Sequence, residues 1–163
     1  MENKLNFNIL LCREADDDLT FIKDIFDTIQ MGEENKISFD IVTLINGTTN
    51  ESKINLICAI EQLDNASHNP NERQATIVNQ FTLEKSGQNI KNDNGTGKLG
   101  SEEMRMEFNS VQHVSGMYFP GKGSYEFQIY RYGDNEINQN KDSINFSDLN
   151  KDHLECAYSF EIL

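Results

Sequence analysis

The sequence predicts an all-β protein, a β-sandwich of immunoglobulin-like or C2-like form with about seven or eight strands. The clearest evidence is the run 121–135, which reads GKGSYEFQIYRYGDN. Here Tyr125, Phe127 and Ile129 point to one side of an extended chain and the residues between them point to the other. A Pro-Gly turn precedes the run and a Gly-Asp-Asn turn closes it. Segments of this kind recur along the chain between polar turns, as in a sandwich.

Seven segments have this alternation together with side chains that favour strands. They are residues 5–13, 36–44, 53–63, 73–83, 104–115, 121–135 and 153–163. Residues 45–50, which include Asn46 and Gly47, are expected to form the turn after the second of these strands. Adjacent strands that are joined by a short polar turn are expected to pair antiparallel.

Residues 19–31 fit two structures. Their apolar side chains recur at helical spacing, and Asp18 is a residue type that caps helices. The apolar set is Leu19, Ile22, Ile25, Phe26 and Ile29. The same segment is rich in Ile, Phe and Thr, which favour strands. From the local pattern alone, a strand and a short helix over 19–30 are both open.

Two long polar stretches, 84–103 and 134–152, interrupt the strands. The first has only Ile90 and Leu99 as large apolar residues, so burial cannot offset the entropy lost on ordering it. Polar loops of this length in a compact domain are often functional, so both are candidate contact loops. Residues 1–163 are expected to form a single domain that buries roughly 70% of the surface of the unfolded chain.

Charge and cysteine content limit the partners and the compartment. The chain carries 27 acidic and 14 basic residues, a net charge of −13, which disfavours nucleic acid and an anionic membrane as partners. No apolar run is long enough to span a membrane, and the N-terminus is expected to form a strand, not a signal peptide. Three cysteines, Cys12, Cys58 and Cys156, cannot all pair within the chain. As buried reduced thiols they indicate a cytoplasmic protein.

Metal-binding patterns are incomplete. His68, His113 and His153 stand far apart in the sequence, and Cys156 would face the opposite side of a strand from His153. No zinc site is therefore expected.

Calcium has two candidate clusters. One is Asp16 to Asp18, and the other is the set Asp148, Asn150 and Asp152. The second resembles half of a calcium loop, but His153 replaces the glycine of the sharp turn and Ser159 replaces the bidentate Glu. Calcium or a small glycan bound near the first cluster is the alternative function.

Catalytic and nucleotide-binding patterns are also incomplete. Residues 94–101 contain glycines and a lysine without the Gly-Lys-Ser/Thr order of a phosphate-binding loop. A Cys-His pair could be drawn from Cys12 or Cys58 with His113, but any chain with three of each allows that. The sequence therefore predicts no catalytic, cofactor-binding or metal-binding residues, and a protein that is not an enzyme.

Aromatic residues gather late in the chain. The group is Tyr118, Phe119, Tyr125, Tyr130 and Tyr132. Such side chains can form a sugar- or peptide-binding surface, although the core of a sandwich uses them more often.

Three stretches of the chain carry a likeness to known proteins: residues 9–15 (ILLCREA), residues 19–29 (LTFIKDIFDTI) and the closing run 121–127 with its Gly-Asp turn. In these stretches the chain resembles an uncharacterised family of bacterial and phage-encoded single-domain β-sandwich proteins of unknown function. In a family strand of the form KLxIIGIFDxI, a glycine stands where this chain has Lys23 and Asp24, so a bulge or a helix at this point stays open as an alternative. The resemblance favours a strand for 19–31 and implies no activity, cofactor or catalytic residue.

The function expected on these grounds is a non-catalytic cytoplasmic module that binds an unidentified protein. Exposed strand edges or the loops 84–103 and 134–152 would make the contact. The negative charge suits a basic partner. The sequence does not indicate an oligomeric state.

Overall fold

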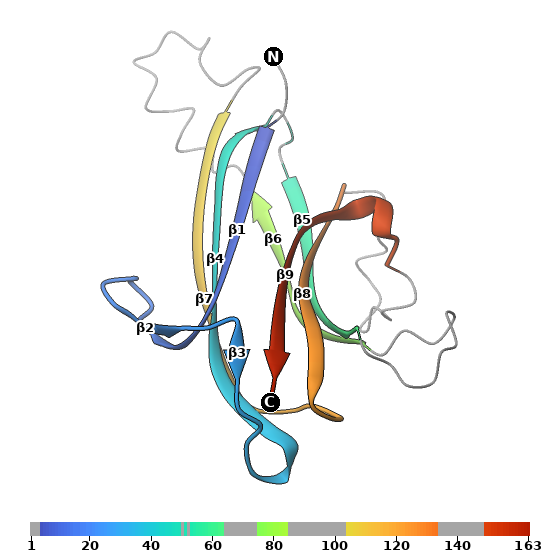
Figure 1. The fold of residues 1–163 in the computed structure, drawn as a ribbon. Helices are drawn as coiled ribbons and strands as arrows, with labels where there is room; N and C mark the ends of the chain where they lie inside the picture. The colour runs from blue at the N-terminus through green and yellow to red at the C-terminus, as the bar shows by residue number, and fades with distance from the viewer. Residues whose placement is uncertain (1–3, 50, 52, 64–74, 85–103, 134–148) are drawn as a thin grey trace, which may run out of the picture.

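A computed structural model describes residues 4–49, 51, 53–63, 75–84, 104–133 and 149–163. The described residues form two facing β-sheets, which confirms the predicted all-β sandwich (Figure 1). The strands are β1 (Lys4–Ala15), β2 (Ile22–Ile25), β3 (Thr28–Ile29), β4 (Lys36–Thr49), β5 (Lys53–Gln62), β6 (Ala75–Glu84), β7 (Met104–Tyr118), β8 (Gly123–Tyr132) and β9 (Leu154–Ile162). Two 3-10 turns, η1 (Glu33–Asn35) and η3 (Lys151–His153), precede β4 and β9.

The first sheet has the order β2-β1-β4-β7 and the second has the order β3-β9-β8-β5-β6. Neighbouring strands pair antiparallel, except that the short β3 runs parallel to β9. None of the helices in the described part of the chain is long and apolar enough to cross a membrane.

Alternation along each strand separates a core side from an outer side. In β8, Tyr125, Phe127 and Ile129 lie in the core between the sheets, as predicted, whereas Tyr130 lies in a smaller cluster on the outer face of the second sheet. The outer face of the first sheet has a third cluster, built on Cys12, Ala15 and Val42. Both sheets therefore bury apolar side chains on two faces.

Residues 19–31 form β2 and β3, so the alternative of a short helix over 19–30 is wrong. Leu19 and Asp24 have φ angles of 55° and 53°, in the left-handed region that a right-handed helix does not contain. β2 pairs with β1, from Cys12 opposite Ile25 to Ala15 opposite Ile22. Pairing with β1 replaces the internal hydrogen bonds that a helix would have supplied.

The turn expected over residues 45–50 is also wrong, because β4 continues through Gly47 to Thr49. Gly47 has a φ of 139°, and a Cβ there would lie 2.0 Å from the carbonyl oxygen of Lys4 on β1. The glycine therefore serves a close approach of two strands and not a turn. β5 starts in the opposite sheet and does not pair with β4, whereas β5 and β6 pair antiparallel as expected.

Most of the predicted loops, 85–103 and 134–148, lies outside the described residues, as do Asp148 and His68. The predictions for these segments stay predictions.

Candidate functional site

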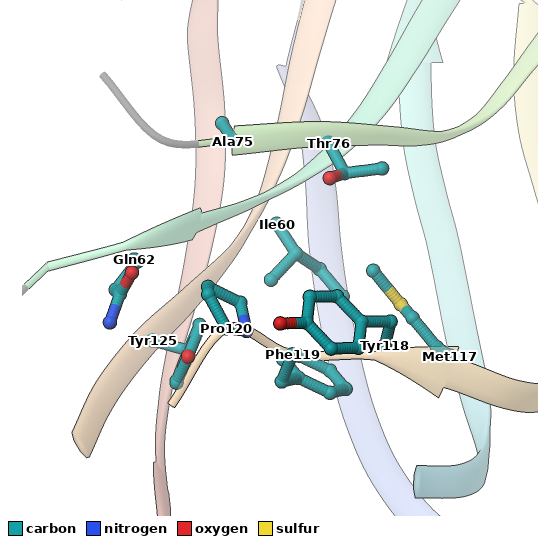
Figure 2. A pocket seen from close by; sticks show the side chains of 9 residues that line it. All are labelled: Ile60, Gln62, Ala75, Thr76, Met117, Tyr118, Phe119, Pro120 and Tyr125. Carbon is teal, nitrogen blue, oxygen red and sulfur yellow. The ribbon is translucent and has the colours of Figure 1, made fainter. Parts of the chain in front are cut away.

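A pocket of about 350 Å³ opens at the end of the sandwich where β7 ends and β8 begins. Figure 2 shows its lining, which comes from both sheets: Ile60, Gln62, Ala75, Thr76, Met117, Tyr118, Phe119, Pro120 and Tyr125. The volume lies at the lower end of the range of pockets that bind small molecules.

The position of the pocket follows from how the edge strands β6 and β7 lie against each other. Phe81 of β6 stacks on Phe108 of β7 with ring centroids 5.3 Å apart. Further along, the side-chain amide of Gln112 donates a hydrogen bond to the carbonyl of Val78 over 3.2 Å. These contacts join the two sheets along this side, and the pocket lies beyond them, where the last residues of β7 face the first residues of β6.

The floor of the pocket is aromatic and held in place. Phe119 and Tyr125 are 1% and 2% exposed, and their rings meet edge to face with centroids 5.1 Å apart. The Tyr125 hydroxyl donates a hydrogen bond to the Gly121 carbonyl over 2.6 Å, and burial raises the pKa of this phenol. The backbone amide of Phe119 donates to the carbonyl of Asn35. A rigid floor lowers the entropy cost of binding.

The rim of the pocket is exposed and uncharged. Tyr118 is 59% exposed, which is high for a large aromatic side chain. Gln62 and Thr76 add an amide and a hydroxyl, and none of the lining residues that the structure describes is charged. These residues can accept an apolar or neutral group, but they offer no counter-ion to a charged one.

The structure divides the predicted aromatic group in two. Tyr118, Phe119 and Tyr125 belong to the pocket, whereas Tyr130 and Tyr132 lie in the outer cluster of the second sheet. The alternation of β8 already implied that Tyr125 and Tyr130 face opposite sides. The partners of Tyr125 on β5 and β6 come from distant sequence, so the pocket itself has no local sequence signal.

Asp16 and Asp17 of the predicted acidic cluster make internal contacts. Asp16 accepts hydrogen bonds from the Thr20 hydroxyl and from the Phe21 amide, which lower the pKa of its carboxyl. Asp17 binds His113 instead. Asp152 lies in η3, far from this turn in Figure 1.

Within the described ranges, no group of three or more His, Cys, Asp or Glu residues could hold a metal ion. His153 stacks on Tyr132 in the outer cluster, whereas the Cys156 thiol points to the carbonyl of Phe7 between the sheets. The prediction that these two side chains face opposite ways is confirmed.

Cys12, Asp40 and His113 form one row across β1, β4 and β7 on the outer face of the first sheet. Asp40 stands between the other two, so Cys12 and His113 are two strand spacings apart, about 10 Å. The Cys12 thiol donates to the backbone carbonyl of Asp40 and not to the imidazole. Cys58 lies in the core, where burial raises its pKa to about 12. The structure therefore brings neither cysteine into contact with His113.

Two carboxylates that sequence reasoning did not single out face each other on the second sheet. Glu61 on β5 is paired in register with Glu126 on β8, and the amide of the fully buried Gln128 donates to both, over 2.7 and 2.8 Å. The Tyr130 hydroxyl donates to the Gln128 carbonyl oxygen, and Lys151 lies 3.5 Å from Glu61. These contacts satisfy the carboxylates structurally and hold the outer face of the sheet.

Comparisons with protein families, with characterised proteins and with solved structures found no match for this chain. The function has to be inferred from the site.

Proposed function

We propose that this β-sandwich is a non-catalytic cytoplasmic protein that binds another protein, and that its pocket takes a bulky uncharged side chain of that partner. The observation that supports this proposal is the pocket. Its buried aromatic floor and the exposed Tyr118 form the kind of cavity that holds an anchor residue in protein interfaces. The bacterial or phage origin rests on the sequence resemblance alone.

Charge complementarity indicates the character of the partner. The uncharged lining selects an uncharged anchor, since a charged group would lose its hydration without gaining a counter-ion. The net charge of −13 attracts a basic surface at longer range and repels an acidic one. The partner is therefore a basic protein segment with an aromatic or large aliphatic side chain.

The strand edges beside the pocket favour this anchor over addition of a partner strand. In β7, Ser115 and Gly116 lie opposite the single residue Ser38 of β4, which makes a bulge. In β6, Val78 is an extra residue between partners of Cys58 and Ala59 on β5. Bulges at sheet edges interrupt the regular row of hydrogen-bonding groups that a further strand needs.

A capture experiment tests the proposal. Tagged wild-type protein and the Tyr118→Ala variant would each be incubated with lysate of the source cell, and the retained proteins compared. The control is Phe21→Ala, which also removes an exposed aromatic side chain, but from the turn before β2. We expect one basic protein to be lost with Tyr118→Ala alone. A partner retained equally by all three proteins would contradict binding at the pocket.

The alternative is a small neutral ligand, such as a glycan, in the same pocket. Gln62 and Thr76 support it, because an amide and a hydroxyl beside an aromatic rim suit hydroxyl groups. A rise in melting temperature with neutral sugars, absent in Tyr118→Ala, would favour this alternative. For calcium bound near Asp16 to Asp18, the corresponding test is a rise in melting temperature on addition of calcium that a chelator reverses.

A further inference from the structure

We propose that His113 is a pH-dependent latch that holds the turn of residues 16–21 over an apolar patch on the outer face of the first sheet. This outer patch consists of Leu10, Cys12, Ala15, Val42, Leu44 and Val111, and Leu19 of the turn packs against it. The proposal does not depend on the pocket or on the proposed function.

The latch consists of one imidazole between two carboxylates from different elements. The Nδ1 atom of His113 lies 2.9 Å from Oδ1 of Asp40 on β4, and the Nε2 atom lies 2.7 Å from Oδ1 of Asp17 in the turn. The other oxygen of Asp40 accepts a hydrogen bond from the Ala15 amide over 2.8 Å. His113 therefore ties the turn to the body of the sheet.

The contact of His113 with Asp17 and Asp40 depends on pH, because it requires a proton on both ring nitrogens of His113. A carboxylate only accepts hydrogen bonds, so both ring nitrogens of His113 must donate, and only the protonated imidazole has two N–H groups. After loss of one proton, one ring nitrogen presents a lone pair to a carboxylate, and that contact becomes repulsive.

Burial decides which contact opens. The Asp40 side chain is 10% exposed and is also held by the Ala15 amide, whereas the Asp17 side chain is 83% exposed. Asp17 can turn into water without leaving a buried charge, so deprotonation of His113 releases the turn and not β4.

The charged groups around His113 determine whether the contact is lost at high or at low pH. Among the described residues, Asp17 from the turn and Asp40 from β4 are the charged groups in contact with His113, and both raise its pKa; the hydrogen bond to Asp17 is the largest single cause, followed by the hydrogen bond to Asp40 and its charge. Cys12 on β1 is two strands away and its own pKa is raised by burial, so it stays a neutral thiol. A raised histidine pKa means that the contact is present at lower pH and is lost as the pH rises through that pKa.

The test compares Asp17→Asn with Asp18→Asn, since each variant removes one exposed carboxylate of the same turn. NMR would follow the imidazole of His113 and the amide of Leu19 through a pH titration. In the wild type we expect both signals to change with the same midpoint, above the ordinary histidine value. Asp17→Asn should lower the midpoint for the imidazole, and Asp18→Asn should leave it close to the wild-type value.

A second measurement reports on the outer patch itself. The rate of alkylation of Cys12 would be measured at one fixed pH by mass spectrometry, so that the intrinsic reactivity of thiols is the same in each protein. We expect a severalfold faster reaction in Asp17→Asn than in Asp18→Asn, with Cys58 protected in both. Equal rates, or a Leu19 signal that does not follow His113, would overturn the latch.

Discussion

At the scale of single residues, Gly47 allows the backbones of β1 and β4 to come close. Gly47 stands inside β4 with a positive φ, where a Cβ would overlap the carbonyl oxygen of Lys4. An Asn-Gly pair normally indicates a turn. Here the contact with β1, which lies more than 40 residues away in sequence, decides the conformation.

Gly47→Ala is therefore expected to destabilise the protein. The strained φ alone costs about 1–3 kcal/mol, and displacement of β1 adds to it. Urea unfolding would measure the change. Gly121→Ala is the matched control, because a Cβ at Gly121 meets nothing within 4 Å, and we expect an unchanged unfolding midpoint. A midpoint for Gly47→Ala equal to that of the control would contradict the close approach.

At the scale of elements, alternation and turn residues were enough to predict most strands. Residues 53–63, 104–115 and 121–135 all contain strands in the structure, with ends that differ by a few residues. The same patterns did not indicate to which sheet a strand belongs. β4 and β5 are neighbours in sequence but lie in opposite sheets, because β4 pairs with β7 and β5 pairs with β8. A local sequence pattern does not show which strands pair when they are distant in the chain.

β2 shows that apolar spacing alone did not distinguish a strand from a helix. Its apolar residues have helical spacing, yet Ile22 and Ile25 are exposed in the structure, so the spacing does not describe a buried face. Asp24 is left-handed with a φ of 53°, a conformation that glycine adopts without steric cost. The pairing of Lys23 with Glu14 and of Ile25 with Cys12 leaves no extra residue, so there is no bulge at this position.

Two glycine substitutions in β2 test this geometry. Asp24→Gly is expected to leave stability unchanged or to raise it by up to about 1 kcal/mol, since glycine adopts a positive φ without steric cost. Lys23→Gly, in extended backbone next to it, should destabilise by about 0.5–1 kcal/mol. Urea midpoints in the opposite order would show that Asp24 is not left-handed in solution.

At the scale of the whole molecule, the pocket is the feature that the sequence could least indicate. Its lining comes from β5, β6, β8, the end of β7 and the turn that follows β7, which meet only after both sheets have formed. The late aromatic residues were a partial signal, since three of the five line the pocket. The sequence also did not indicate the row of Cys12, Asp40 and His113. In this row, three strands bring together residues that are up to 101 positions apart in the chain. The immunoglobulin-like or C2-like form stays a prediction.

Photo-crosslinking from the rim of the pocket would show directly whether a partner protein binds there. A photoreactive phenylalanine derivative would replace Tyr118 in one protein and Phe21 in another, and both would be irradiated in the source cell. We expect position 118 to capture one protein, attached through an uncharged residue within a basic segment, and position 21 not to capture it. Capture of the same protein from both positions, or of none from position 118, would contradict the pocket as the binding site.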